Sequence, residues 1–205
     1  MRTIELFSGT KSFSEVMKKH GHQTLTLDDN KSLFPDMCVD ILQLNIIPTV
    51  DILWASPPCQ GFSVAVIGRN WNYDRTPKTE SARTAMLLAQ KTILLIEESK
   101  PTYWFIENPR GMLRKMRWME DFLIKNGGVQ HTISYCQYGD TRMKPTDIWT
   151  NAKWWTPRVI CKNGSPCHVS APRGSKTGTQ GIKGAKDRGK IPSELFEEIL
   201  TQYAS

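Results

Sequence analysis

The stretch Asp51-Ile-Leu-Trp-Ala-Ser-Pro-Pro-Cys-Gln-Gly-Phe-Ser63 decides the fold of this chain. Its apolar run from Ile52 to Ala55 is typical of a short buried strand in a parallel sheet. Two prolines end that strand, and a lone cysteine, Cys59, follows them in a segment of loop-forming residues. Open α/β sheets bind ligands at the carboxyl ends of their strands, so we expect the Cys59 thiol at a functional site. A structural cysteine buried beside a turn is the alternative.

The segments on both sides of this stretch alternate between strand-like and helix-like patterns. We expect strands at 2–7, 24–27, 38–41, 50–55, 103–106, 132–138 and 147–150. We expect helices at 12–21, at 80–98 after an N-cap at Thr79, at 113–125 and at 191–203. This order predicts an α/β fold, a doubly wound and mostly parallel sheet whose last two strands form an antiparallel edge hairpin. The segment 61–78 shows no period and is predicted as a long loop.

Composition places the chain among globular proteins with an anionic partner. Its 205 residues suffice for one domain, and 39% of them are hydrophobic. The net charge of +7 favours a polyanion, nucleic acid first. No apolar run approaches the roughly 20 residues of a membrane span, and no signal peptide is visible. Five cysteines at irregular spacing indicate a reducing cytosol rather than a disulfide framework.

Small and acidic residues end the first three predicted strands. The turn Ser8-Gly9-Thr10 joins a strand to a helix, as in dinucleotide-binding folds, where the helix N-terminus offers free N–H groups. Asp28 and Asp29 follow the second strand, where a carboxylate suits a ribose diol; a plain turn is the other reading. Asp40 lies near the end of the third. Together these residues predict a pocket for a nucleoside-bearing cofactor.

A further carboxylate, Glu107, follows the strand at 103–106, one crossover after the strand that leads to Cys59. A thiolate is a strong nucleophile, and a carboxyl group facing it can act as an acid or as a hydrogen-bond partner. The pair therefore predicts covalent catalysis at the carboxyl edge of the sheet.

These motifs resemble, in the same order along the chain, those of the cytosine-5 DNA methyltransferases. Phe7-Ser-Gly-Thr10 looks like the motif that binds the cofactor, and Pro57-Pro-Cys-Gln60 looks like the catalytic motif. Glu107 and Asn108 match the family's Glu-Asn pair, with Pro109 in place of the more usual Val. The resemblance implies a Rossmann-like class I methyltransferase that uses S-adenosylmethionine.

The resemblance also implies a mechanism. Cys59 would add to carbon 6 of cytosine, which makes carbon 5 able to take the methyl group. Glu107 would hold the ring N3 and the exocyclic amine. The target atom lies inside a duplex, so the base must be flipped out, and the loop at 61–78 would cover it. The implied partner is duplex DNA, with no membrane, and the chain is expected to act as a monomer.

The cofactor contacts carry over as a set of residues around the first three strands and the catalytic loop: Phe7, Ser8, Gly9, Thr10, Asp28, Asp29, Asp40, Ile41 and Pro57. In this assignment Phe7 stacks on the adenine and the turn after it approaches the methionine. Asp28 binds the ribose, with Asp29 as its rival. Asp40 meets the adenine amine and Ile41 the adenine face, while Pro57 lies near the sulfonium.

The chain departs from the family pattern in its last third. The family has Gln-Arg-x-Arg after a Tyr-Gly pair; here Tyr138-Gly139 is followed by Arg142 and Lys144, which we align with that basic motif. The resemblance then implies that both cations contact the cytosine carbonyl and the phosphates. The closing motif is also altered, because Arg188-Gly-Lys-Ile-Pro192 stands in its place.

The interval 151–187 is too short for a folded target-recognition domain. We therefore expect one catalytic domain over 1–205, with 151–187 as a basic loop. Relaxed or very short sequence recognition follows, with binding carried by phosphate contacts, and the abbreviated form resembles phage-encoded members of the family. The cations that favour a nucleic-acid loop over a plain linker are Arg173, Lys176, Lys183 and Lys186.

Cys161, Cys167 and His168 form a second group of potential ligands. Zinc sites use closer pairs and four ligands, so Cys136 or His131 would have to complete a site. We expect no metal, and a loop with incidental thiols.

Two other functions remain open on the sequence. One is methylation of RNA or of other pyrimidine substrates. The other is a non-catalytic DNA-binding protein with a vestigial cofactor pocket, which Lys11 and the altered closing motif favour and which intact Cys59 and Glu107 disfavour.

Overall fold

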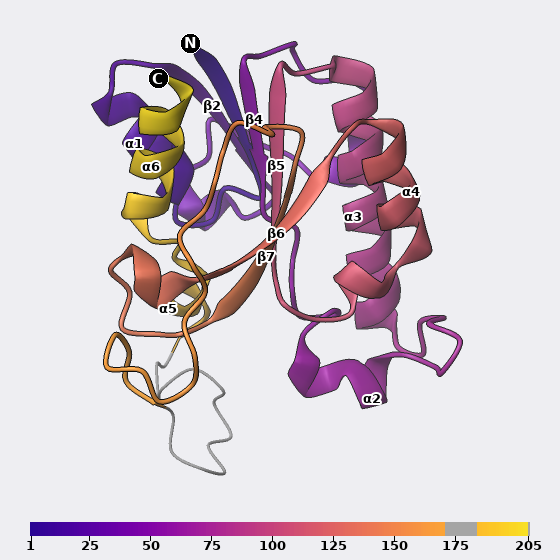
Figure 1. Cartoon of the computed structure of the whole chain (residues 1–205). Coiled ribbons are helices and arrows are strands. Elements are labelled where there is room, and N and C mark those ends of the chain that lie inside the picture. The colour runs from indigo at the N-terminus through magenta and orange to yellow at the C-terminus, as the bar shows by residue number, and fades with distance from the viewer. Residues whose placement is uncertain (171–183, 205) are drawn as a thin grey trace.

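A computed structural model describes residues 1–170 and 184–204, in which one sheet is covered by helices on both faces (Figure 1). The strands are β1 (Arg2–Leu6), β2 (Gln23–Asp28), β3 (Met37–Cys38), β4 (Ile52–Ala55), β5 (Tyr103–Pro109), β6 (Val129–Ser134) and β7 (Pro145–Thr150). They lie in the order β3-β2-β1-β4-β5-β7-β6. The first five run parallel, and β7 is antiparallel to both β5 and β6. The predicted doubly wound sheet with an antiparallel hairpin is confirmed.

Helices from distant parts of the sequence share each face of the sheet. The helices are α1 (Ser12–Lys19), α2 (Ile67–Asn70), α3 (Glu80–Ser99), α4 (Arg117–Lys125), α5 (Ala185–Gly189) and α6 (Ser193–Tyr203). Figure 1 shows α1 and α6 on one face and α3 and α4 on the other. No helix in the described part of the chain combines the length and the apolar character that a membrane crossing requires.

Strand β4 is apolar throughout because it is buried on both faces. Leu53 and Ala55 join the core under α3 and α4, while Ile52 and Trp54 join the core under α1 and α6. Side chains alternate between the faces of a strand, so one continuous apolar run serves both cores. The ring of Trp54 packs among aromatic rings of three other elements at centroid distances of 4.8–5.8 Å: Phe13, Phe105 and Phe196.

Helix α3 begins where the sequence predicted. The Thr79 hydroxyl accepts a hydrogen bond from the Ala82 N–H at 3.3 Å, which caps the helix. The buried stripe includes Ala85, Ala89 and Ile96, at the spacing of one helical face.

Three predicted elements are shorter or broken. The helix at 113–125 divides at Met116 into a 3-10 turn, Leu113–Lys115, and α4. The strand at 132–138 ends at Ser134, and a 3-10 helix, Tyr135–Tyr138, follows it. The strand at 38–41 ends at Cys38. Each segment is apolar enough for either structure, and packing decides between them.

The segment 61–78 is folded, so its prediction as an irregular loop was wrong. Phe62 and Trp71 are buried and stacked, with ring centroids 5.5 Å apart. The Trp71 Nε1–H donates to the Gly61 carbonyl at 2.7 Å, and α2 lies between the two rings in sequence. These two aromatic residues anchor the segment to the core, while Val64 and Tyr73 remain exposed.

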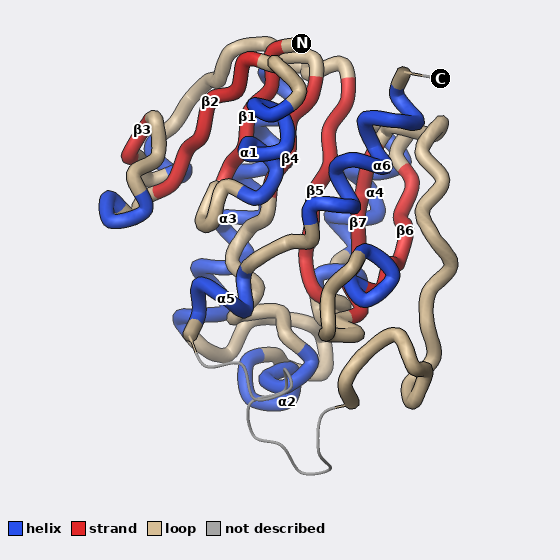
Figure 2. Tube along the Cα trace, turned by 90° about the vertical axis from the view of Figure 1, so that its left-hand side faces the viewer, coloured by secondary structure: helices blue, strands red, loops and turns tan. Residues whose placement is uncertain are grey.

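After β7 the chain returns along the β6 edge of the sheet (Figure 2). Arg158 holds this segment to α6 through ion pairs with Glu194 and Glu198 at 2.9 and 3.0 Å. Arg173, Lys176 and Lys183, predicted to belong to a basic loop, lie outside the described residues. So does the side chain of Lys186.

Candidate active site

Cys59 and Glu107 both lie at the carboxyl edge of the sheet because their strands are neighbours, and the charge of Glu107 acts on the Cys59 thiol. Strands β4 and β5 pair in parallel with Ala55 opposite Ile106, so Glu107 comes one residue and Cys59 four residues beyond that pair. The buried Asn108 side chain donates from Nδ2 to the Pro57 carbonyl at 2.8 Å. This bond ties the cysteine loop directly to the end of β5.

The Cys59 thiol is half-buried, and its surroundings control its ionisation. Burial raises the pKa of the Cys59 thiol, and the negative charge of Glu107 raises it further. The positive charges of Lys144 and Arg188 act in the opposite direction. The thiol is therefore protonated at neutral pH in the free protein, and added positive charge at this edge favours the reactive thiolate.

Glu107 is buried, and a tyrosine holds its carboxyl group. The Tyr135 hydroxyl donates to Glu107 Oε1 at 2.8 Å. Burial raises the pKa of Tyr135 well above its usual value, and the charge of Glu107 adds to this, so the hydroxyl stays a donor. The Lys144 ammonium lies 4.5 Å from the centre of the Tyr135 ring. Sequence reasoning missed Tyr135, which it treated as one more strand residue.

Arg142 has other partners than the substrate groups predicted for it. Its side chain is buried, and Nε donates to both oxygens of Asp140 at 2.9 Å. Its Nη2 donates to Asp140 as well. The remaining N–H groups reach the carbonyls of Asp187, Arg188 and Lys190 at 3.0–3.2 Å. All the donors of the guanidinium are engaged, so Arg142 joins the turn after β6 to the segment before α6.

Lys144 is more accessible than Arg142. It is half-buried, and its Nζ lies 3.4 Å from the Arg188 carbonyl. Its backbone φ of 26° is unusual for a residue with a side chain. Of the predicted basic pair, Lys144 is the cation whose charge acts on the Cys59 thiol.

The turn after β1 is tightly bent by residues in the left-handed backbone conformation. Phe7, Gly9 and Lys11 have φ values of 57°, 47° and 57°, all in the left-handed region. The Gly9 N–H donates to Asp28 Oδ2, and the Asn30 N–H donates to Oδ1, each at 2.9 Å. Asp28 therefore holds the turn in place across the gap between β1 and β2.

The remaining predicted cofactor residues differ in what they can offer. Asp29 is exposed, and Asp40 is exposed while it caps a 3-10 turn by accepting from the Leu42 N–H. Thr10 shares a hydrogen bond with Ser12 at 2.8 Å. Ile41 is only 2% exposed and belongs to the core, so its side chain has little surface for an adenine ring. Its predicted contact with the adenine face has no support in this packing.

Comparisons with known proteins agree on one family. A sequence profile described as C-5 cytosine-specific DNA methylase matches residues 1–125. The chain is 26% identical over 225 residues to the "Probable DNA (cytosine-5)-methyltransferase" of Frog virus 3 (isolate Goorha). That alignment covers 98% of this chain and 99% of the viral protein.

Solved methyltransferase structures share the fold. EhMeth of Entamoeba histolytica aligns with a TM-score of 0.53 and 14% identity, over 78% of this chain and 56% of that protein. A DNMT2 mutant of Spodoptera frugiperda aligns with a TM-score of 0.50 and 20% identity, over 83% of this chain and 57% of that protein. This chain thus spans little more than half the length of those two proteins. On the match over 1–125, the chain belongs to the C-5 cytosine-specific DNA methylase family.

Proposed function

We propose that this chain transfers a methyl group from S-adenosylmethionine to carbon 5 of a flipped cytosine in DNA, through a covalent adduct of Cys59. The observation that carries the proposal is that Cys59 and Glu107 follow the paired ends of β4 and β5, close enough for the charge of Glu107 to act on the thiol. The Asn108 bond to the Pro57 carbonyl supports it, because a nucleophile must be held in a narrow range of positions.

In this mechanism the Cys59 thiol first loses its proton to solvent, and the thiolate then forms a bond from sulfur to carbon 6 of the ring. Glu107 takes up a proton when the base binds, so that its carboxyl group donates to N3 and accepts from the exocyclic amine while negative charge moves into the ring. Tyr135 keeps the carboxyl group oriented. The cofactor supplies an electrophilic methyl group on its sulfonium. Once carbon 5 carries the methyl, the proton of carbon 5 leaves to a base and the bond to Cys59 breaks.

Lys144 is the cation that supports the Cys59 thiolate in this proposal. Its charge already lowers the pKa of the thiol, although burial and Glu107 outweigh it. A DNA phosphate cannot do this, so the protein must supply the positive charge. Arg142 acts as a positioning residue, because its hydrogen bonds hold the segment that carries Lys144 against residues 187–190.

The residues around β1 and β2 fit S-adenosylmethionine. The Ser8 hydroxyl is buried and has no hydrogen-bond partner among the described residues, which is costly unless a ligand satisfies it. Asp28 accepts two N–H bonds and keeps further lone pairs for ribose hydroxyls. Phe7 is half-buried at the start of the turn, where its ring can meet the adenine, and Pro57, which is buried, would lie near the sulfonium.

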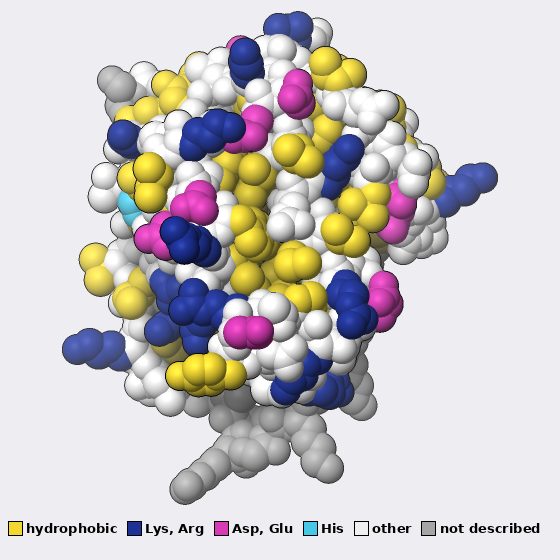
Figure 3. Space-filling view, turned by 90° about the vertical axis from the view of Figure 1, so that its right-hand side faces the viewer, with side chains coloured by type: hydrophobic (Ala, Val, Ile, Leu, Met, Phe, Trp, Pro, Cys, Tyr) yellow, Lys and Arg dark blue, Asp and Glu magenta, His cyan; other side chains and the backbone are white. Residues whose placement is uncertain are grey.

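DNA is the proposed substrate because cations gather where the strands end. Figure 3 shows Lys and Arg side chains over both the upper and the lower parts of the face that carries α3 and α4, interspersed with acidic ones. Exposed cations stand on the segments that follow β4 and β5: Arg69, Arg75, Lys78, Arg110 and Lys115. Such side chains bind phosphates without reading sequence, so we propose relaxed or short recognition by a monomer.

The segment 61–78 is the proposed cover over the flipped base. Phe62 near its start and Trp71 near its middle are buried and anchor it, while Val64, 65% exposed, lies between them and is free to contact a ligand. The domain assignment stays a proposal of the same kind: one catalytic domain, with 151–187 in place of a folded recognition domain.

Transfer of a tritiated methyl group from the cofactor tests the function. We expect label in DNA, and none in RNA or free nucleotides. DNA that contains 5-fluorocytosine should trap a covalent complex, because fluorine cannot leave carbon 5 as a proton does. Label in RNA alone would show that the substrate is RNA and not DNA. DNA binding with no methyl transfer would show that the protein is a non-catalytic DNA-binding protein.

A further inference from the structure

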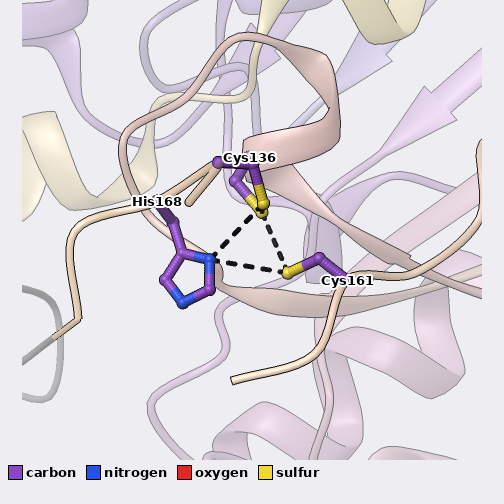
Figure 4. A group of neighbouring side chains, drawn as sticks. Cys136, Cys161 and His168 are labelled. Atoms are coloured by element: carbon purple, nitrogen blue, oxygen red, sulfur yellow. Dashed lines mark hydrogen bonds between the residues drawn. The ribbon is translucent and has the colours of Figure 1, made fainter. Parts of the chain in front are cut away.

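Four potential metal ligands, Cys136, Cys161, Cys167 and His168, converge beside the end of β6. Their ligand atoms all lie within 4.8 Å of one another. Cys136 belongs to the 3-10 helix Tyr135–Tyr138, whereas the other three come from the segment after β7. Figure 4 shows Cys136, Cys161 and His168 pointing toward a common centre. The sequence predicted incidental thiols here, and the structure instead brings in the fourth ligand.

The distances between these atoms are near those of a metal site, with one sulfur pair closer than in a loaded site. Cys136 Sγ lies 3.2 Å from Cys161 Sγ and 3.6 Å from Cys167 Sγ. His168 Nδ1 lies 3.6 Å from the sulfurs of both Cys161 and Cys167. Tetrahedral zinc, with Zn–S of about 2.3 Å and Zn–N of about 2.0–2.1 Å, places sulfurs about 3.8 Å apart and a sulfur and nitrogen about 3.6 Å apart.

The same distances exclude a disulfide. A disulfide bond joins its sulfurs at about 2.05 Å, and all of the cysteines are free. Three thiol groups and an imidazole nitrogen that face one another supply the soft ligands that zinc prefers. His131, the other candidate for a fourth ligand, lies against the Trp155 ring, with centroids 5.3 Å apart.

The backbone around the cluster is held independently of any ion. The Cys161 N–H donates to Ser134 Oγ at 3.2 Å, and the Val169 N–H donates to the Thr141 carbonyl at 2.9 Å. The Gln137 side chain donates to Cys167 Sγ at 3.3 Å, as outer partners of metal-bound thiolates do. The ligand positions are therefore set by hydrogen bonds on both sides of the cluster.

We propose that Cys136, Cys161, Cys167 and His168 bind one zinc ion in a closed Cys₃His site. Protein ligands fill all four positions and leave none for water, so the site is structural rather than catalytic. It joins the segment after β7 to the 3-10 helix that carries Tyr135, the partner of Glu107. This proposal is independent of methyl transfer, because a protein without that activity would keep the site.

Metal analysis of the purified full-length chain tests the proposal. Under reducing conditions we expect about one zinc per chain by plasma mass spectrometry, and less than about a tenth of that in Cys161→Ser. Cys38→Ser is the matched control, because Cys38 is exposed in β3, away from the cluster, and should keep the zinc. Zinc-free wild-type protein that also fails to take up added zinc would overturn the proposal.

Cobalt substitution keeps the proposal testable if the variants fail to fold. Wild-type protein loaded with Co²⁺ should show the visible absorption of tetrahedral cobalt and the near-ultraviolet band of thiolate ligands, which zinc then abolishes. His168→Asn should change the visible band and keep the thiolate band. A spectrum of octahedral cobalt without a thiolate band, or thiols that oxidise to a disulfide in the presence of zinc, would contradict a Cys₃His site.

Discussion

Two sites of this protein differ in what brings their side chains together. One is the Cys59 edge, which is the carboxyl edge of the sheet with Cys59 and Glu107. The other is the Cys136 cluster, which consists of Cys136, Cys161, Cys167 and His168. At the edge, Cys59 and Glu107 are adjacent because β4 and β5 pair in parallel, and each residue follows its strand directly. In the cluster, Cys136 and Cys161 meet because the chain folds back after β7 and runs beside β6. Sheet register therefore holds one site and a long return connection holds the other, so substitutions in the two should have different consequences.

The largest effect is expected for Cys59, whose substitution should reduce methyl transfer strongly and change the stability of the fold little. Cys59→Ser should lower methyl transfer by at least about 10³-fold, since a hydroxyl is a far weaker nucleophile than a thiolate. The half-buried position tolerates the loss of sulfur, so the unfolding free energy should change by less than about 1 kcal/mol. Labelled methyl transfer and urea denaturation measure the two quantities. A variant with unchanged transfer would remove Cys59 from the mechanism.

The second prediction concerns the same substitution, cysteine to serine, in the Cys136 cluster. Cys136→Ser should lower the unfolding free energy by at least about 2 kcal/mol, or about 4–8 °C in melting temperature, because the zinc is lost. Chelation of the wild-type zinc should produce a shift of the same direction. Thermal unfolding followed by circular dichroism measures both. If Cys136→Ser lacks zinc and still unfolds at the wild-type temperature, the ion does not stabilise the segment after β7.

The third prediction concerns Glu5, which lies buried in β1 and accepts hydrogen bonds from the Phe13 and Ser14 N–H groups at the start of α1. Burial raises its pKa from 4.5 to about 7, against the lowering effect of these bonds. Between those values the folded chain keeps a proton that the unfolded chain releases. Glu5 therefore contributes stability at low pH that is lost as the pH rises through about 7.

Glu5→Gln removes this dependence. Between pH 4.5 and 8 the wild type should lose up to about 3 kcal/mol of unfolding free energy relative to the variant. Urea denaturation of both proteins across that range measures the difference. Parallel curves for the two proteins would mean that Glu5 has the same pKa in the folded and unfolded chain.

A fourth prediction tests the bond between the cysteine loop and β5. Asn108→Ala leaves the Pro57 carbonyl without its donor and should cost about 1–3 kcal/mol of stability. Because the loop then moves relative to Glu107, kcat should fall while KM for DNA stays nearly constant. Asn126→Ala, which removes the amide at the C-cap of α4 far from the edge, is the control for a purely structural effect. A loss confined to stability would show that register alone positions Cys59.

The smallest expected effect belongs to Tyr135, which lies between the two sites. Tyr135→Phe removes the hydrogen bond to Glu107 and should reduce methyl transfer about tenfold, equivalent to about 1.4 kcal/mol. Zinc content should be unchanged, because the backbone of the Cys136 turn is kept. A tenfold loss together with zinc release would mean that the two sites are coupled through this turn.

Predictions from the sequence succeeded where a short segment carries its own signal. The run from Ile52 to Ala55 indicated a strand buried on both faces, and Thr79 marked the first residue before α3. They failed where an apolar segment can adopt more than one structure. Tyr135–Tyr138 is a 3-10 helix and not a strand, and Phe62 and Trp71 order a segment that looked irregular. The periodicity of hydrophobic residues does not predict such contacts, because the partners lie elsewhere in the chain.

By itself the sequence determined the order of strands and helices, and it placed Cys59 and Glu107 just beyond two of them, because strand ends follow from local residue types. The tertiary structure alone decided the partners of those residues. It turned Arg142 inward to Asp140 and to residues 187–190, and it joined Cys136 to Cys161, Cys167 and His168. These contacts depend on how the connections cross the finished sheet, and no local pattern encodes that path.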